Sequence, residues 1–432
     1  MQQIQQNFAV AGNPVSHSLS PLLFDDFAKQ NGKNYFYSRI LSTNVNNILE
    51  IVNAFDIKGL NITSPYKQDI LQFVNIKSEE VNILNAANTI VFNENINAFN
   101  TDVSGVINSL KKYINTQKKA IVLGAGGAAK AAVQGLKILG IEDIFIANRT
   151  KEKAKQIADK FDINYLLFEN IKNEYFSIII NTIPVLIGEI GELKVNDKAI
   201  LFDANYKNKP LKTLATQNNA VYIDGLEWLK EQGKEAYFKM TGIKNNNLYL
   251  QNKDIEKIKK RSQRLAMIGP MASGKSKVGR NLAKILGFDF VDMDDIIVVE
   301  ENRSITNIFE ESGEDYFREK EKQLLKKLVK KNEIVISTGG GVIKDDENIN
   351  VLKNNCWNIM LYSSAEVRSS RINTDKRPLL KGKDVKSTME KLFSERKNNY
   401  FKTSDIIVNR NENTLEKDIK LIYEDYSKTF GI

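Results

Sequence analysis

Residues 119–140 read KAIVLGAGGAAKAAVQGLKILG, which is a short apolar strand, a glycine-rich turn and a helical stretch. Gly124, Gly126 and Ala129 fill a G-x-G-x-x-A pattern between strand and helix. The first glycine permits a tight turn, the second lets a pyrophosphate approach the backbone, and the helix N-terminus supplies N–H donors. The stretch therefore predicts a Rossmann-like unit that binds a dinucleotide.

The next strand ends in residues whose charge distinguishes the two nicotinamide dinucleotides. An enzyme that uses NAD would place Asp or Glu there, to hydrogen-bond the ribose 2′-hydroxyl. This chain offers Arg149 and Lys153 instead, and arginine pairs well with a phosphate. The sequence therefore favours NADP over NAD. The predicted NADP-binding residues are Gly124, Gly126, Gly127, Ala128, Asn148, Arg149, Thr150, Lys153 and Gly225.

A second glycine-rich stretch, RLAMIGPMASGKS at residues 264–276, fits the pattern G-x-x-x-x-G-K-S directly after a strand. In such a P-loop the backbone N–H groups cradle phosphates, the lysine reaches the β- and γ-phosphates, and the serine binds Mg²⁺. Ala272 would be modestly strained if its position requires a positive φ. The predicted ATP-binding residues here are Gly269, Ala272, Ser273, Gly274, Lys275, Ser276 and Lys277.

The composition argues against several classes of protein. The 432 residues carry a net charge of +9, but bases and acids are interspersed without a basic tail, so we expect no nucleic-acid partner. Cys356 is the single cysteine, so no disulfide can form within the chain. The opening residues show no basic stretch followed by an apolar one, and Pro184 and Gly188 interrupt the apolar run 177–190. We expect a cytoplasmic protein that does not enter a membrane.

Alternating apolar strands and helical patterns predict an α/β fold throughout the chain. The predicted parts are a substrate-binding α/β domain (1–102 plus 225–250), a Rossmann-like NADP domain (103–224), a linker (251–263), and a P-loop α/β/α domain with a parallel sheet (264–432). The linker is predicted from its charged sequence NKDIEKIKKRSQ, which offers little apolar surface to bury. Such a linker implies that the parts before and after it work independently.

Six short motifs follow one another between residues 8 and 242. They are Ser18 to Pro21, Asn61 to Lys67, Ala87 to Thr89, Asn100 to Asp102, Asp203 to Tyr206, and Asp224 to Gln232. In this order they resemble the shikimate dehydrogenase family. Two features differ from the family pattern: Val103 and Ser104 separate Asp102 from Gly105, where the family often has glycine directly after the aspartate motif, and residues 184–188 lengthen the loop near the nicotinamide. The resemblance implies a polyol carboxylate, 3-dehydroshikimate, bound by Ser18, Ser20, Thr63, Lys67, Asn88, Asp102, Tyr206 and Gln232.

Reduction of a ketone needs a hydride donor and a proton donor at the carbonyl oxygen. Lys67 and the single histidine, His17, are the candidates for the proton donor. Lys67 can serve if a neighbouring carboxylate and partial burial set its protonation. We assign Lys67 as the catalytic acid and Asp102 as the carboxylate that orients it, and we interpret His17 as a structural neighbour of the serines.

A further set of motifs lies between residues 265 and 425. They are Asp292-Met293-Asp294, Phe317-Arg318, Gly339-Gly340-Gly341, Arg377 to Leu380, and Glu395-Arg396. With the P-loop they resemble the shikimate kinase family. The resemblance implies that Asp292 and Ser276 hold Mg²⁺, that Asp294 and Lys275 are catalytic, and that Arg377 contacts ATP and the phosphoryl group in transfer. Shikimate would contact Asp294, Arg318, Gly339, Gly340, Gly341 and Arg396.

Together the two resemblances imply a bifunctional enzyme of aromatic biosynthesis. It would reduce 3-dehydroshikimate with NADPH and then phosphorylate shikimate with MgATP. Two alternatives are a quinate/shikimate dehydrogenase joined to a kinase of another small metabolite, and a non-catalytic metabolite-binding regulator. The presence of Lys67, Asp102, Lys275 and Asp294 argues against the regulator, because binding alone would not require all four. The expected partners are small-molecule substrates, and a homodimer is left open.

Overall fold

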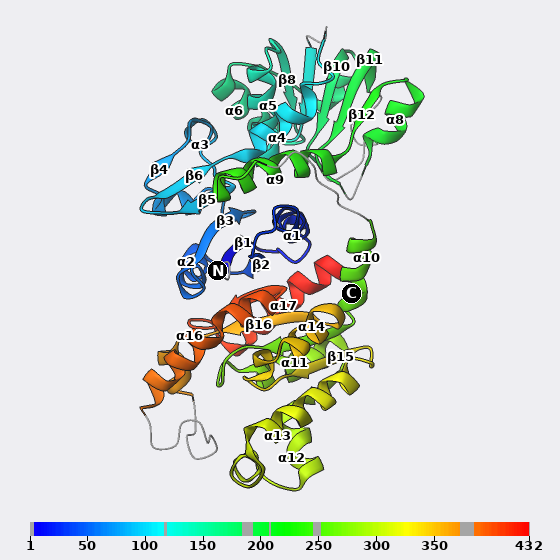
Figure 1. Ribbon diagram of the computed structural model, residues 1–432. Helices are drawn as coiled ribbons and strands as arrows, with labels where there is room; N and C mark the ends of the chain where they lie inside the picture. The colour runs from blue at the N-terminus through cyan, green and yellow to red at the C-terminus, as the bar shows by residue number, and fades with distance from the viewer. Residues whose placement is uncertain are drawn as a thin grey trace. The chain divides into compact units, whose positions relative to one another are not determined.

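The computed structural model describes residues 4–115, 119–183, 193–206, 209–244, 252–371 and 384–431. The chain forms two compact units, one of residues 1–69 with 249–432 and one of residues 70–248. Both units consist of mainly parallel strands covered by helices, which confirms the predicted α/β class (Figure 1). The units divide the chain at other points than the predicted domain boundaries, because the first 69 residues fold with the C-terminal part.

The strands of the first unit follow an order that combines the two ends of the chain. Neighbouring strands are β14 (Asp289–Asp292), β15 (Ile334–Ser337), β13 (Arg264–Ile268), β16 (Trp357–Tyr362), β17 (Ile406–Asn409), β2 (Tyr35–Leu41), β1 (Gln6–Gly12) and β3 (Ile57–Ile62). All of these neighbours pair in parallel. The four strands β13, β15, β16 and β17 are buried almost continuously, as parallel strands covered on both faces should be.

Helices cover both faces of these strands. On one face α11 (Lys275–Leu286) packs beside α17 (Leu415–Phe430), over an apolar cluster that includes Trp357 and Ile359 of β16. Successive side chains of a strand point to opposite faces. Tyr362 therefore points to the other face, where its ring meets Phe55 and Phe393. That face carries α2 (Val45–Ala54), α14 (Asp346–Asn355) and α16 (Val385–Thr403).

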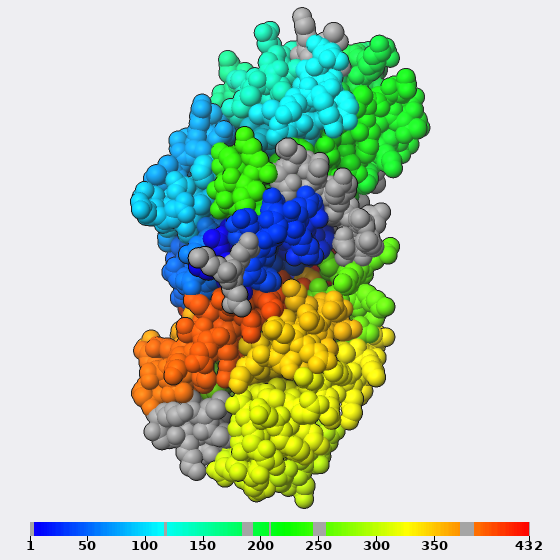
Figure 2. Space-filling view, viewed as in Figure 1, coloured from blue at the N-terminus to red at the C-terminus, as the bar shows by residue number. Residues whose placement is uncertain are grey.

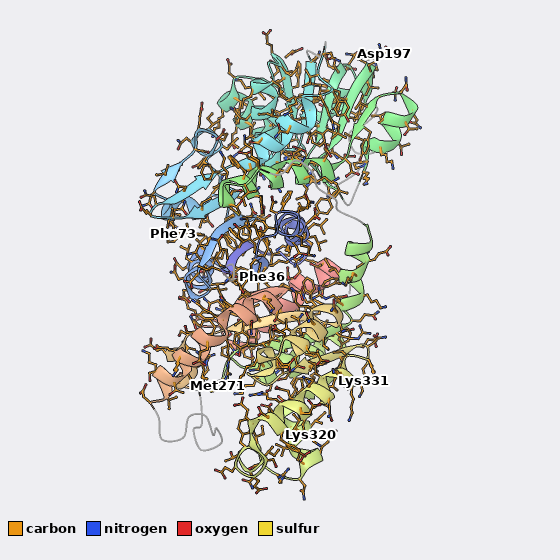
Figure 3. All side chains as sticks on the ribbon, in the orientation of Figure 1. Phe36, Phe73, Asp197, Met271, Lys320 and Lys331 are labelled. Carbon is orange, nitrogen blue, oxygen red and sulfur yellow. The ribbon has the colours of Figure 1, made fainter. Side chains whose placement is uncertain are left out.

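The remaining helices of the first unit are α1 (Ser20–Gln30), α10 (Asn252–Arg261), α12 (Met293–Glu301), α13 (Ile305–Leu328) and α15 (Ala365–Ser369). Helix α13 is interrupted at Gly313, whose φ of 86° and ψ of 166° are not helical. Figure 3 labels Lys320 on this helix and Lys331 just after its end.

The segment expected to be a linker is largely helix α10, and its last turn is anchored in the first unit. Ile258 packs against the apolar cluster between the strands and α17. Arg261 donates hydrogen bonds of 2.9 and 2.7 Å to the carbonyl oxygen of Cys356, and it forms an ion pair with Asp405. The carbonyl of Ser262 accepts a 2.6 Å hydrogen bond from Tyr426. These contacts fix the helix against the strands that follow it.

The second unit contains a six-stranded parallel sheet. Its order is β12 (Val221–Ile223), β11 (Lys194–Asp203), β10 (Tyr175–Asn181), β7 (Lys119–Leu123), β8 (Asp143–Ala147) and β9 (Asn164–Leu166). The chain proceeds outward from β7 in both directions, so the strand order reverses between β7 and β10. In such a sheet, ligands bind at the carboxyl ends of the strands beside this switch point. The predicted glycine turn follows β7, at that place.

The other elements of the second unit are the antiparallel pair β5 (Thr89–Phe92) and β6 (Ile96–Phe99), the short β4 (Ile76–Lys77), and a set of helices. The helices are α3 (Glu79–Leu84), α4 (Thr101–Leu110), α5 (Gly127–Ile138), α6 (Lys151–Phe161), α7 (Phe168–Ile171), α8 (Leu211–Gln217) and α9 (Gly225–Thr241). Gly105 is required where α4 meets α9, because a Cβ atom there would lie 2.5 Å from the Trp228 ring. Among the helices of the described residues, none combines the length and the apolar character that a membrane-spanning helix needs.

Candidate active sites

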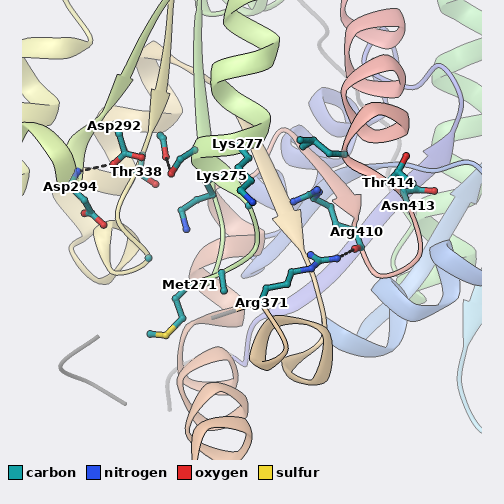
Figure 4. A pocket seen from close by; sticks show the side chains of 16 residues that line it. Met271, Lys275, Lys277, Asp292, Asp294, Thr338, Arg371, Arg410, Asn413 and Thr414 are labelled. Carbon is teal, nitrogen blue, oxygen red and sulfur yellow. Dashed lines mark hydrogen bonds between the residues drawn. The ribbon is translucent and has the colours of Figure 1, made fainter. Parts of the chain in front are cut away.

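A cavity of about 610 Å³ lies around the P-loop of the first unit. Its lining includes the predicted residues Ala272, Gly274, Lys275, Ser276, Lys277, Asp292 and Asp294. In Figure 4 the two aspartates stand on one side of Lys275, and Arg371 and Arg410 on the other. The structure thus gathers most of the predicted phosphate-binding and metal-binding residues in one place, whereas Gly269 and Ser273 of the P-loop do not line the cavity.

The backbone of the P-loop depends on two glycines. Gly269 has a φ of 142°, and a Cβ atom there would lie 2.6 Å from the carbonyl oxygen of Leu361. Gly274 has a φ of 90°, and its Cβ would lie 1.9 Å from Nη1 of Arg410. Ala272 has a φ of 61°, so the strain expected from a positive φ is present at this position. The loop therefore follows a path that glycine alone can take at residues 269 and 274.

Lys275 is held inside the loop. Its ammonium group donates hydrogen bonds of 2.9 Å to the carbonyl of Gly269 and 3.0 Å to that of Pro270, and the residue is 9% exposed. The hydroxyl of the next residue, Ser276, lies 3.3 Å from the hydroxyl of Ser337 at the end of β15. Helix α11 begins at Lys275, so its N-terminal dipole also favours negative charge in the cavity.

Two arginines that the sequence analysis did not predict, Arg371 and Arg410, also line this cavity. Arg410 donates 2.6 Å hydrogen bonds to the Asp418 carboxylate and to the carbonyl oxygen of Ser273 in the P-loop. Arg371 donates a 3.1 Å hydrogen bond to the carbonyl oxygen of Arg410. Burial lowers the pKa of Arg371, and the neighbouring charge of Arg410 adds to this effect. No motif marked these residues, while the predicted Arg377 lies outside the described residues.

A second, smaller cavity of about 70 Å³ adjoins the first. Its lining contains all six residues predicted to bind shikimate in this part of the chain, Asp294, Arg318, Gly339, Gly340, Gly341 and Arg396. Met271, Asp294 and Gly340 line both cavities. Nη1 of Arg396 donates a 3.2 Å hydrogen bond to the carbonyl of Gly340. Asp294 is the carboxylate at which the two cavities meet.

The glycine triplet makes room for charged side chains. A Cβ atom on Gly339 would lie 2.5 Å from Oε1 of Glu321 and 3.0 Å from Oδ1 of Asp294. A Cβ atom on Gly341 would lie 2.3 Å from Nη2 of Arg318. Gly339 and Gly341 therefore leave room for the side chains of Glu321, Asp294 and Arg318.

Glu321 is a site residue that the sequence analysis missed. It is fully buried, and it accepts a 2.8 Å hydrogen bond from Nη1 of Arg318. Burial raises the pKa of Glu321, and Arg318 opposes this rise. Burial also acts to lower the pKa of Arg318, but Glu321 and Glu314 outweigh it and raise that pKa overall. Glu321 follows Arg318 by three positions, so the two side chains share a helix face, and this spacing was the signal that the sequence offered.

In the second unit, a cavity of about 280 Å³ opens at the switch point of the sheet. Its lining is Gly124, Ala125, Gly126, Asn148, Arg149, Thr150, Lys153, Thr182 and Ile183. Gly124, with a φ of 113°, has no room for a Cβ atom, which would lie 2.3 Å from the hydroxyl of Thr182. Six of the residues predicted to bind NADP therefore line one cavity.

The other three predicted NADP-binding residues lie outside that lining. Gly127 and Ala128 form the first turn of α5. Gly225 begins α9, where a Cβ atom would lie 2.7 Å from the carbonyl oxygen of Ala204, so close packing accounts for this glycine. Pro184 and Gly188, in the loop expected near the nicotinamide, lie outside the described residues.

The eight residues predicted to bind the polyol fall in both units. In the second unit Asn88 and Gln232 meet at Thr101, the neighbour of Asp102. The side-chain oxygen of Asn88 accepts a 2.8 Å hydrogen bond from the Thr101 backbone N–H, and the Thr101 hydroxyl donates a 3.3 Å bond to Gln232. The carbonyl of Asp102 accepts a 3.0 Å hydrogen bond from Trp228, and Tyr206 follows β11 and is half-buried.

In the first unit, Ser18 lies on the loop after β1, Ser20 begins α1, and Thr63 and Lys67 lie on the loop after β3. The hydroxyls of Ser18 and Ser20 are 3.2 Å apart. The end of β1 packs closely on the loop after β3. A Cβ atom on Gly12 would lie only 2.2 Å from the Thr63 methyl group, so glycine is needed there. Lys67 is half-buried and follows Tyr66, whose hydroxyl donates a 2.6 Å hydrogen bond to the carbonyl of Ser42.

Comparison with known proteins gives matches along most of the chain. Residues 10–90 match the shikimate dehydrogenase substrate binding domain, residues 109–184 the shikimate / quinate 5-dehydrogenase model, and residues 271–427 the shikimate kinase model. The shikimate dehydrogenase (NADP(+)) of Maridesulfovibrio salexigens is 32% identical over 251 residues, which are 55% of this chain and cover 92% of that protein.

Two further relatives represent the C-terminal part and the solved structures. The bifunctional shikimate kinase/3-dehydroquinate synthase of Thermotoga maritima is 43% identical over 137 residues, which are 32% of this chain and cover 27% of that protein. The crystal structure of shikimate 5-dehydrogenase from Thermus thermophilus, in complex with NADP(H) and shikimate, is similar with a TM-score of 0.51 and 27% identity. The match covers 56% of this chain and 95% of that one.

Proposed function

Since this chain belongs to the shikimate dehydrogenase family and carries a shikimate kinase domain at residues 271–427, we propose that its two activities act in succession. The dehydrogenase reduces 3-dehydroshikimate to shikimate with NADPH, and the kinase phosphorylates shikimate to shikimate 3-phosphate with MgATP. The product of the first reaction is thus the substrate of the second. We further propose a cytoplasmic location, small molecules as the only partners, and a homodimer as the assembly to test.

The observation that carries the kinase assignment is the meeting of two cavities at Asp294. The larger one has the P-loop backbone and Lys275 to hold phosphates, and bound ATP supplies the phosphoryl group. The smaller one has Arg318 and Arg396, which suit a carboxylate. Asp294 binds the reacting hydroxyl between them and takes its proton. Phosphoryl transfer relies mainly on such positioning and on charge stabilisation.

The residues beside the P-loop also suit Mg²⁺. Ser276, Asp292 and Asp294 line the same cavity with hydroxyl and carboxylate oxygens, which are the donors that this ion prefers. We propose Ser276 and Asp292 as the residues that hold it. Asp292 also accepts a 3.1 Å hydrogen bond from the backbone N–H of Asp294, which fixes its orientation at the start of α12.

For the dehydrogenase, the cavity beside β7 and β8 fits the adenosine half of NADP(H). Arg149 and Lys153 line it and would pair with the 2′-phosphate, while the backbone after Gly124 would receive the pyrophosphate. Bound NADPH supplies the hydride. Ser18 and Ser20 would bind the substrate carboxylate, Lys67 would donate the proton to the carbonyl oxygen, and Asp102 would orient Lys67.

A coupled assay tests this proposal. The intact chain, supplied with 3-dehydroshikimate, NADPH and MgATP, should oxidise NADPH at 340 nm and form shikimate 3-phosphate. Lys275→Ala should abolish phosphorylation and leave NADPH oxidation unchanged, because Lys275 lies in the P-loop cavity alone. A chain that oxidises NADPH with quinate-derived ketone but not with 3-dehydroshikimate would favour the quinate alternative. Loss of both activities in the variant would contradict the separate roles.

A further inference from the structure

Strand β17 of the kinase domain pairs directly with strand β2 of the substrate-binding segment. The parallel register places Ile406 opposite Arg39, and Val408 opposite Leu41. Unpaired strand edges expose rows of backbone donors and acceptors, so this pairing satisfies groups that separate domains would leave to water. In Figure 2 the N-terminal segment, in blue, lies directly against the orange segment that includes α16, and α16 contacts β2.

The apolar core is continuous across this strand pair. One cluster joins Val10, Val15 and Leu41 to Met267 and Ile422, all of them buried. Behind the strands, the ring of Phe55 lies 5.5 Å from that of Phe393 and 5.6 Å from that of Phe401. Lys353 of α14 reaches the ring of Phe36 on β2, which is labelled in Figure 3. Separating the two segments would expose these apolar side chains to water, which is unfavourable.

Within this shared core, Asp425 of α17 holds the chain just before the serine motif. Its Oδ1 accepts hydrogen bonds of 2.6 Å from the backbone N–H of Val15 and 3.0 Å from that of Ser16, and its Oδ2 accepts one from the Ser16 hydroxyl. Asp425 is 1% exposed. The carbonyl of Val15 in turn accepts a 3.0 Å hydrogen bond from the N–H of Ser18. The carboxylate thus fixes the turn that ends at Ser18.

Arg39 holds the same loop from its other side. Its guanidinium donates hydrogen bonds of 2.7 and 3.2 Å to the carbonyl oxygen of Ser18 and one of 3.4 Å to that of Asp405, and it lies over the Trp357 ring. Burial lowers the pKa of Arg39 to about 10, while the carboxylates of Asp405 and Asp425 oppose this decrease. Both anchors of the serine loop therefore depend on residues of the kinase domain.

We propose that the kinase domain is a working part of the dehydrogenase, in which Asp425 is a positioning residue for the loop that carries Ser18 and leads into Ser20 at the start of α1. This inference rests on the proposed binding of the substrate carboxylate by that loop. A misplaced loop weakens binding of the carboxylate, but it leaves NADP binding and hydride transfer nearly unchanged. The proposal replaces the expectation that the parts before and after residues 251–263 work independently.

Kinetics of full-length variants test this role through oxidation of shikimate with NADP⁺. Asp425→Ala should raise the KM for shikimate about tenfold or more, with kcat within about threefold and an unchanged KM for NADP⁺. Asp425→Asn should have a smaller effect, because its amide oxygen can still accept from Val15 and Ser16. The matched control is Asp56→Asn, which weakens the ion pair of Asp56 with Lys397 in the same unit, away from the serine loop.

Hydrogen exchange gives a readout that does not depend on activity. Amides of a peptide covering residues 13–24 should exchange faster in Asp425→Ala than in the parent chain, and at the parental rate in Asp56→Asn. If Asp425→Ala fails to fold, Ser16→Ala replaces it, since this change removes the hydroxyl bond alone. Unchanged exchange and unchanged KM in a folded variant would overturn the proposal. A parent chain that does not oxidise shikimate would instead overturn the proposed function, and exchange would still decide the role of Asp425.

Discussion

The backbone of Gly341 and the guanidinium of Arg318 are so close that a Cβ atom at residue 341 would lie 2.3 Å from Nη2 of Arg318. Arg318 is also held by ion pairs with Glu314 and Glu321, at 3.1 and 2.8 Å, so it has little freedom to withdraw.

Gly341→Ala should therefore displace Arg318 from the small cavity. We expect the KM of the kinase for shikimate to rise about tenfold or more, with little change in the KM for ATP, because a lost charge-assisted hydrogen bond is worth about 1.5–3 kcal/mol. Gly340→Ala is the comparison, since its Cβ would make an ordinary contact of 3.4 Å with the Met271 nitrogen. An equal effect of both changes would mean that crowding of the ligand, not displacement of Arg318, is responsible.

Lys67→Ala should lower the kcat of the dehydrogenase by about two to four orders of magnitude, the usual contribution of a positioned acid. Phosphorylation of added shikimate should continue at the parental rate. Lys58→Ala, which removes an exposed lysine from β3, is the control and should retain full reduction. Near-normal turnover of Lys67→Ala would remove Lys67 from the catalytic role and return attention to His17.

Arg149→Ala should raise the KM for NADPH about tenfold or more and leave kcat nearly unchanged, because the 2′-phosphate is remote from hydride transfer. The KM for NADH should not change, since NADH has no phosphate at that position. Lys155→Ala, an exposed lysine on α6 outside the cavity lining, provides the control. A parent enzyme that prefers NADH would already contradict the assignment.

Cys356 should resist thiol reagents in the folded protein. It is fully buried, and burial raises its pKa to about 12, so the reactive thiolate is scarce at pH 8. Labelling should become complete in denaturant, and it should be faster in Arg261→Ala, which loses two hydrogen bonds to the Cys356 carbonyl. Rapid labelling of the native parent chain would contradict the burial of Cys356 between α14 and β16.

The sequence by itself determined the two nucleotide sites and most of the chemistry around them. Gly124 and Gly274 could be recognised because a strand–turn–helix unit is set by short-range sterics, and both have a positive φ in the structure. The six residues predicted to bind shikimate in the kinase also line one cavity, and four short motifs were enough to identify them. Glu321 was not predicted, because in the sequence it looks like the solvent-exposed glutamates of its helix. Only the structure shows that it is buried.

Only the tertiary structure decided which segments share a core. The pairing of β17 with β2, and the contact of Asp425 with Ser16 across 409 positions, leave no mark in the local composition of either segment. The linker prediction relied on charge alone, yet α10 packs the partly buried Ile258 against the core and anchors Arg261. Local sequence specifies which backbone conformations are sterically accessible. Which strand edge a β-strand pairs with, and which buried donors a carboxylate receives, depend on the packing of the whole unit.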